Sequence, residues 1–172
     1  MNLYEIAKEL EEKGYFPKYA DFHLSVICAI IGQRIAFSRA RKLRTNLLNT
    51  YEKMEEKESI EKLKKIDYVK VGCDKVQIER ISEYLNNFKD WPNIKGIGKW
   101  TIKSITLITR SKGWKDIWLC EDCYVKQAIN ELKIKKKDFK EPGYISLLLW
   151  RVKKDSRYKL IRREKIDKID LL

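Results

Sequence analysis

Two glycines one residue apart interrupt a helix-rich sequence at Ile94-Lys95-Gly96-Ile97-Gly98-Lys99-Trp100-Thr101. Glycine tolerates backbone angles that other residues avoid, so this pattern predicts a tight turn between two helices. The amide groups at the start of the second helix, together with the helix dipole, would form an anion-binding site flanked by Lys95 and Lys99. Ile97 is expected to plug the turn into the core. An ordinary helix–helix turn with a C-capping glycine explains the same residues, so the phosphate-binding interpretation depends on the rest of the chain.

Apolar residues at helical spacing lie on both sides of this turn and favour an all-α fold. The apolar run 22–31, preceded by a capping Asp21, is the expected central core helix. A basic helix follows it, and Asp74 and Asp122 are expected to begin two further helices. Seven glycines and three prolines in 172 residues are too few for a turn-rich β-sandwich or barrel. No linker or repeat divides the sequence, which therefore predicts a single compact helical domain over residues 1–172.

The chain carries 38 Lys and Arg residues against 25 Asp and Glu residues, a formal net charge of +13. A surplus of this size on a small domain attracts polyanions, and nucleic acid is the commonest such partner. A solvated lysine-rich surface is the competing explanation. The basic run 133–140 and the basic C-terminal segment 151–172 are expected to track a phosphate backbone or to be solvated faces.

Metal-ligating side chains other than carboxylates are few, and they are Cys28, Cys73, Cys120, Cys123 and His23. Only Cys120 and Cys123 have metal-ligand spacing, and a structural zinc site needs four ligands, so no metal is expected. No run of cysteines matches an iron–sulfur motif. No apolar run approaches membrane-spanning length, and the first residues indicate an amphipathic helix rather than a signal peptide. The protein is therefore expected to be soluble and intracellular, not secreted, with reduced thiols and no membrane partner.

Downstream of the glycine turn, the sequence continues with Gly113-Trp114 and then Glu121-Asp122 before an apolar helix that carries Lys126-Gln127. Together with the turn, this order resembles the helix-hairpin-helix (HhH-GPD) DNA glycosylase superfamily, closest to the catalytic core of 3-methyladenine DNA glycosylase II. The match spans about residues 20–155. Further segments that resemble the family, in family order, are 29–33, 40–43, 72–81 and 144–150.

The resemblance implies a base-excision-repair enzyme that flips a damaged base, first of all an alkylated purine, out of double-stranded DNA and hydrolyses its N-glycosidic bond. Asp122 would be the catalytic carboxylate, which stabilises positive charge on the sugar; a helix N-cap role is compatible with this. Bifunctional members place a lysine two residues after the second hairpin glycine, where this chain has Trp100. A monofunctional mechanism without strand cleavage is therefore expected, although Lys103 or another lysine could stand in for the missing lysine.

The resemblance also assigns DNA contacts and a base pocket. The implied DNA-binding residues are Lys95, Gly96, Ile97, Gly98, Lys99 and Thr101 in the turn, and Gln33, Arg34 and Ile35 in the loop that fills the gap left by the flipped base. Arg34 or Ile35 would be the wedge. The implied pocket residues, for each of which a core position is the alternative, are Trp100, Tyr124, Tyr144 and Trp118. Trp100 would stack on a cationic base.

No cofactor is implied, apart from a monovalent cation at the hairpin. One aromatic position of the family, at the start of its closing helix, falls on Glu141 or Pro142 here. The enzyme would act as a monomer, associated with DNA in the cytoplasm or nucleoid, or in a eukaryotic nucleus. Hypoxanthine, uracil and 8-oxoguanine are further candidate bases.

Two other functions fit the same sequence. A bifunctional 8-oxoguanine-type glycosylase with AP lyase activity would form a lysine Schiff base that borohydride traps. A non-catalytic helix-hairpin-helix module would bind DNA without releasing a base. Asp122 argues against the binding module, because binding to a polyanion gains nothing from a carboxylate.

Overall fold

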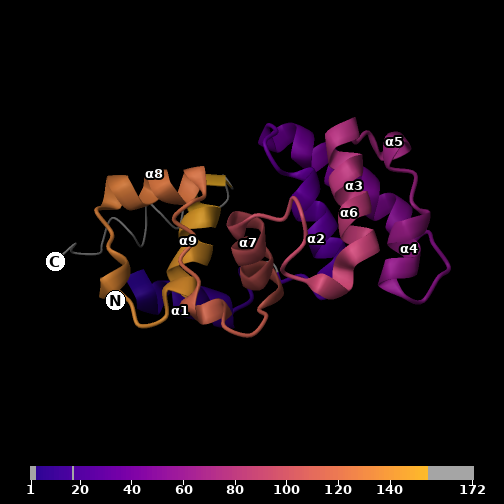
Figure 1. Ribbon diagram of the computed structural model, residues 1–172. Helices are drawn as coiled ribbons and strands as arrows, with labels where there is room; N and C mark the ends of the chain where they lie inside the picture. Colours follow the sequence, from indigo (N-terminus) through magenta and orange to yellow (C-terminus); the bar gives the residue numbers. More distant parts are fainter. Residues whose placement is uncertain (1–2, 17, 155–172) are drawn as a thin grey trace. The chain divides into compact units, whose positions relative to one another are not determined.

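The computed structural model describes residues 3–16 and 18–154, and over these residues the chain forms helices and no strand (Figure 1). The prediction of an all-α fold is therefore confirmed. The basic C-terminal segment predicted at 151–172 lies outside the described residues from residue 155 onward. The α-helices are α1 (Leu3–Glu12), α2 (Phe22–Ile31), α3 (Phe37–Glu52), α4 (Ser59–Lys65), α5 (Tyr68–Val71), α6 (Lys75–Asn87), α7 (Lys99–Thr109), α8 (Cys123–Leu132) and α9 (Pro142–Lys154). Short 3-10 helices are η1 (Phe88–Asp90), η2 (Trp114–Asp116) and η3 (Lys136–Asp138).

The chain divides into two compact units. We call Tyr19–Ile105 the central unit, and the combination of Met1–Lys18 with Thr106–Leu172 the terminal unit. The division falls within α7, so the first residues of this helix belong to the central unit and its last residues to the terminal unit. This division is finer than the single domain that the sequence predicts, and the single domain stays a prediction.

Helix α2 is the core of the central unit. All residues from 25 to 31 are buried, and α2 packs against α3, α4 and α6. Burial of each large aliphatic side chain contributes about 1.5–3 kcal/mol to the free energy of unfolding. A helix that is apolar on every side has to be enclosed by other elements, and the predicted central core helix is confirmed.

Asp21 fixes the start of α2. Its Oδ1 accepts hydrogen bonds from Leu24 N at 2.9 Å and from Ser59 Oγ at 2.8 Å, and its Oδ2 accepts one from the Tyr51 hydroxyl at 2.5 Å. Partial burial raises the pKa of the Asp21 carboxyl, but these three hydrogen bonds outweigh it, and the pKa lies below its usual value. The predicted N-cap is therefore confirmed, and it also joins α2 to α3 and α4.

Helix α9 has the corresponding place in the terminal unit, where it packs against α1, α8 and η2. Residues 144–149 of this helix are all buried. At its start, a Cβ atom on Gly143 would lie 2.2 Å from the Trp114 carbonyl oxygen, so only glycine permits this approach to η2. Elsewhere in the unit, Arg110 forms two bonds to the Glu11 carboxylate, from Nε at 2.5 Å and from Nη2 at 2.6 Å. This buried ion pair joins α1 to the chain after α7.

We predict that Asp21→Ala lowers the free energy of unfolding by about 2 kcal/mol at pH 7, because the N-cap is lost and the Tyr51 hydroxyl loses its acceptor. Urea unfolding measures the change. Asp21→Asn, which keeps an acceptor for Leu24, is the control and should lose less.

The pH dependence has a definite sign. Because the pKa of Asp21 is lower in the folded state, its ionisation stabilises the fold above the ordinary aspartate pKa of about 4, and this contribution is lost as the pH falls through the folded-state pKa. The gap in stability between wild type and Asp21→Asn should therefore shrink on acidification. An Asp21→Ala protein as stable as wild type at pH 7 would contradict this account.

Candidate nucleic-acid interface

The glycine turn lies between η1 and α7 in the central unit. Ile97 N donates a hydrogen bond to Ile94 O at 3.0 Å, and Gly96 has a φ of +83°, in the left-handed region that favours glycine. The predicted tight turn is therefore present. Ile94, at 5% exposure, is the buried isoleucine of the turn, whereas Ile97, which was expected to pack into the core, is half-buried. The turn thus buries the first isoleucine more completely than the second.

The start of α7 offers a place for an anion. The hydrogen bond that Ile102 N donates to Gly98 O, at 3.2 Å, is the first of the helix. A Cβ atom on Gly98 would meet nothing within 4 Å. The surface beside this backbone is therefore open to a close approach. Lys95 and Lys99 are exposed on either side. Helix N-termini attract anions through their first amide groups and the helix dipole, and two exposed lysines add to that attraction.

Gln33 joins this turn to the loop that follows α2. Its Nε2 donates to Thr101 Oγ1 at 2.6 Å, and its Oε1 accepts from Arg80 Nη1 at 2.8 Å. Thr101 is 1% exposed, so its hydroxyl contacts protein in this conformation. The sequence predicts DNA contacts for both Gln33 and Thr101, and the structure places their side chains in contact with each other. The structure also adds Arg80, which no local sequence pattern indicates because only its contact across 47 residues reveals it.

Arg34 has a backbone conformation that is rare for its residue type. Its φ of +57° lies in the left-handed region, which disfavours side chains with a Cβ atom. The side chain is exposed, whereas Ile35 is half-buried. Arg34 is therefore the more accessible of the two predicted wedge residues. Strained backbone conformations of this kind are also often found at functional sites.

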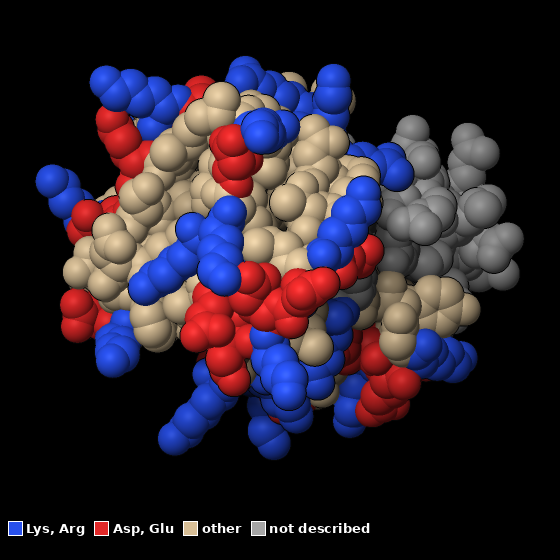
Figure 2. Space-filling model, turned by 90° about the vertical axis from the view of Figure 1, so that its right-hand side faces the viewer, with Lys and Arg blue, Asp and Glu red and all other residues tan. Residues whose placement is uncertain are grey.

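The positive charge of the chain is not spread evenly. Figure 2 shows a face on which acidic side chains gather near the middle, with Lys and Arg side chains mostly around them. The net charge of the molecule therefore does not locate a nucleic-acid interface. The interface has to be inferred from the positions of individual residues.

Asp122 is the N-cap of α8 in the terminal unit. Its Oδ1 accepts hydrogen bonds from Tyr124 N at 3.0 Å and from Val125 N at 3.2 Å, and the residue as a whole is 4% exposed. The predicted helix start is confirmed. Glu121 beside it is exposed. Among the described residues, Asp122 is the only buried Asp or Glu.

The segment that leads to Asp122 is held by Ser146 of α9. The Ser146 hydroxyl accepts from Leu119 N at 3.0 Å and donates to Ile117 O at 2.9 Å, and Ser146 is fully buried. A short extended segment next to a helix start has backbone groups that need partners, and Ser146 provides two of them. The position of Asp122 is thereby fixed from both sides, by its own helix and by α9. Nothing in the local sequence marks Ser146 for this role.

The four predicted pocket aromatics differ in exposure. Tyr144 is 6% exposed and packs edge-on against Tyr4 and Trp114, with ring centroids 5.7 and 4.8 Å apart, so it is a core residue of the terminal unit in this conformation. Trp118, Tyr124 and Trp100 are half-buried.

Glu141, one of the two positions to which the resemblance would assign an aromatic residue, belongs to an ion-pair cluster. Glu141 accepts a hydrogen bond from the Tyr4 hydroxyl at 2.5 Å and forms an ion pair with Lys115 at 3.0 Å. The hydrogen bond to Glu141, with burial, raises the pKa of Tyr4 to about 12, and the hydrogen bonds from Tyr4 and Lys115 lower the pKa of Glu141. These contacts tie α1 to the start of α9, so they are structural.

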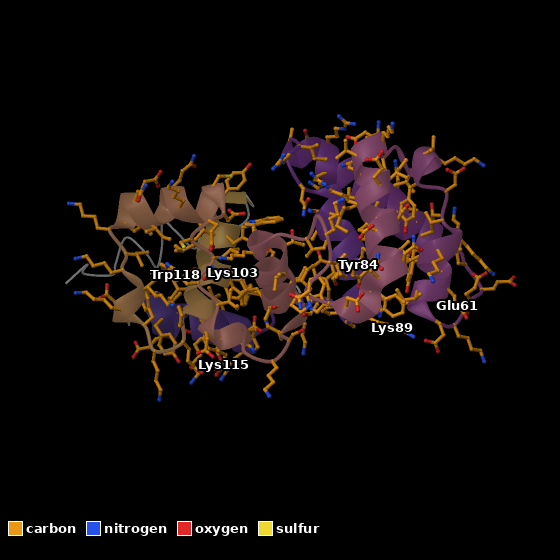
Figure 3. The ribbon with its side chains drawn as sticks, viewed as in Figure 1. Glu61, Tyr84, Lys89, Lys103, Lys115 and Trp118 are labelled. Carbon is orange, nitrogen blue, oxygen red and sulfur yellow. The ribbon has the colours of Figure 1, made fainter. Side chains whose placement is uncertain are left out.

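The remaining predictions concern Lys103, metal ligands and membrane-spanning helices. Lys103, labelled in Figure 3, is a half-buried residue of α7. Within the described part of the chain, no three His, Cys, Asp or Glu residues lie together as metal ligands, and no helix is long and apolar enough to cross a membrane. The predicted monovalent cation at the hairpin stays a prediction.

No protein-family model, curated protein or solved structure matches this chain. Its functional interpretation therefore depends on its own residues, on their geometry and on the resemblance of its motifs.

We predict that Lys99→Gln weakens binding to undamaged duplex DNA about 5- to 10-fold at physiological salt and lowers the slope of log Kd against log salt by about 1, because one phosphate contact is lost. Fluorescence anisotropy with a labelled duplex measures both quantities. Lys57→Gln is the matched control: it removes the same charge from an exposed lysine of the same unit, outside the turn. Equal losses for the two variants would show that only net charge matters.

We predict that Arg34→Gly raises the free energy of unfolding by about 0.5–1 kcal/mol, since glycine adopts the left-handed conformation without strain, yet weakens binding to a duplex with an abasic-site analogue several-fold. The matched control is Lys133→Gly, an exposed residue with a φ of +51° in the terminal unit. It should stabilise the protein to a similar degree with a smaller loss of affinity. Urea unfolding and anisotropy give the two numbers, and an affinity loss confined to Lys133→Gly would contradict the assignment.

Proposed function

We propose that this chain is a monofunctional DNA glycosylase, which flips a damaged base out of double-stranded DNA and hydrolyses its N-glycosidic bond. The observation that carries the proposal is the burial of Asp122. In the described part of the chain, Asp21, Asp67, Asp74 and Asp122 cap helices through their side chains, and of these four only Asp122 is buried. Capping does not require burial, and removing a carboxylate from water is unfavourable. A buried carboxylate at the position that the family motif assigns to catalysis therefore favours a catalytic role.

The chemistry suits a carboxylate. As the bond between the sugar and the base breaks, the bonding electron pair leaves with the base and positive charge develops on the sugar. The Asp122 carboxylate would stabilise that charge, and a water molecule would then attack the anomeric carbon and give up its proton to this carboxylate. A positively charged alkylated purine leaves as a neutral molecule, so no general acid is required. Alkylated purines are accordingly the first substrate class to test.

The turn and the loop after α2 would hold the DNA. Lys95, Lys99 and the start of α7 would bind phosphates, which position the protein without reading sequence. Arg34 or Ile35 would fill the gap left in the duplex, and Trp100 would stack on the extruded base.

Trp100 also bears on strand cleavage. It occupies the position where bifunctional members of the family carry their nucleophilic lysine, so we expect hydrolysis without a Schiff base. Trapping of the protein on its substrate by borohydride would overturn this expectation. Lys103 would then be the first candidate for the nucleophile.

The proposal is tested with duplexes that each carry one lesion: an alkylated purine, hypoxanthine, uracil or 8-oxoguanine. Base release is measured, and strand breaks are scored before and after alkali. We expect release of one class of base, with breaks only after alkali. Breaks without alkali would identify a lyase instead. Binding to these duplexes with no release of any base would support a non-catalytic DNA-binding module.

We predict that Asp122→Asn lowers the single-turnover rate of base release at least about 100-fold while the protein keeps its affinity for DNA, because asparagine preserves the cap and removes only the charge. Asp74→Asn is the matched control, since Asp74 also accepts a backbone hydrogen bond as an N-cap but is exposed. Its rate should equal that of wild type. Equal rates for Asp122→Asn and wild type would assign Asp122 to capping alone.

A further inference from the structure

Arg80 of α6 contacts both segments that we propose to bind DNA. Its Nη1 donates to Gln33 Oε1 at 2.8 Å, in the loop after α2. Its Cγ lies 3.6 Å from the point that a Cβ atom on Gly96 would occupy, so the stem of the side chain packs against the glycine turn. Arg80 is half-buried, and the sequence motifs assign it no role.

The contact with Arg80 fixes the orientation of the Gln33 amide. A guanidinium can only donate, so the amide oxygen of Gln33 has to face Arg80 and the amide nitrogen has to face Thr101. The positive charge also polarises the amide and strengthens its second hydrogen bond, which runs to Thr101 Oγ1 at 2.6 Å. Because Thr101 is 1% exposed, this bond lies in a region where an unmade hydrogen bond is costly.

We propose that Arg80 is a positioning residue for damaged DNA: through Gln33 and Thr101 it holds the glycine turn and the 33–35 loop in one fixed arrangement. The inference rests on the proposed function, since it concerns how the same site recognises its DNA. The turn grips the phosphate backbone, and the loop fills the gap in the base stack. A duplex with a gap in its base stack is bound by the turn and the loop together, so the two have to be held in the correct relative position. An intact duplex is bound by the turn alone.

We call the contacts among Arg80, Gln33 and Thr101 the link. The affinity for a duplex with a gap should depend on this link, and the affinity for an intact duplex should not. Without the link, the loop has to be ordered again each time DNA binds, and that cost falls only on the duplex that uses the loop. We expect the preference for a duplex with an abasic-site analogue over the intact duplex to fall about 10-fold when the link is broken. The salt dependence should stay unchanged, because no phosphate contact is removed.

The test uses the full chain and two labelled duplexes, one intact and one with an abasic-site analogue. Gln33→Met and Thr101→Val break the link without a change of charge, and both should reduce the preference for the abasic duplex. Thr101→Ser keeps the acceptor hydroxyl and should retain it. A loss of stability alone would not change the ratio of two affinities measured on folded protein.

Arg80 itself is examined in a double-mutant cycle with Gln33→Met. Arg80→Met should reduce the preference in the wild-type background and have little further effect on it in the Gln33→Met background, and the cycle cancels the effect of the lost charge. Additive effects, or an unchanged preference in Gln33→Met and Thr101→Val, would overturn the inference. So would a wild-type protein that binds the two duplexes equally. Failure of wild type to bind either duplex would instead overturn the proposed function.

Discussion

The end of α2 is the point on which the central unit depends. Because this helix is buried on every side, its last carbonyl groups cannot be satisfied by water. Arg44 Nε donates to Cys28 O at 2.8 Å from α3, and Gln77 Nε2 donates to Ile31 O at 2.8 Å from α6. Gln33 then continues the same set of contacts. Two helices, α3 and α6, are thus oriented around the end of α2, and the loop that leaves this end has little freedom.

In the terminal unit, the buried backbone groups that need hydrogen-bond partners lie at a helix start. Ser146 satisfies the backbone before α8, and Asp122 satisfies the backbone inside it. Buried polar groups of this kind stabilise a fold only when every partner is present, so each of them also specifies one arrangement. In both units, the residues that we propose for function lie directly beside such a set of contacts. Their geometry is therefore set by the packing of the unit, and not by flexible loops.

Local signals in the sequence predicted the helix starts well. Asp21, Asp74 and Asp122 all cap helices as expected, because an aspartate before an apolar run has a chemical reason to be there. Pro142 begins α9, as a proline in a first turn should. The short helix α5 was not foreseen, since four residues give no periodicity to detect. In the glycine turn, composition predicted the reversal but not which isoleucine is buried, which depends on the path of the backbone.

The contacts that position the candidate site could not be predicted. Gln33 meets Arg80 across 47 residues and Thr101 across 68, and Ser146 meets Leu119 across 27. No local pattern marks such pairs, because each of these side chains is also typical of an exposed helix or loop. A sequence motif can therefore name Gln33 and Thr101, but only the fold shows that they contact each other and that Arg80 joins them.

The most direct test of this account is to map the DNA contacts on the ¹⁵N-labelled protein by amide chemical shifts, during titration with a duplex that carries an abasic-site analogue. We expect the largest changes on residues 95–101 and on Arg34 and Ile35, and we expect them to weaken as salt is raised. Changes confined to other surfaces, or none at all at saturating DNA, would contradict this expectation.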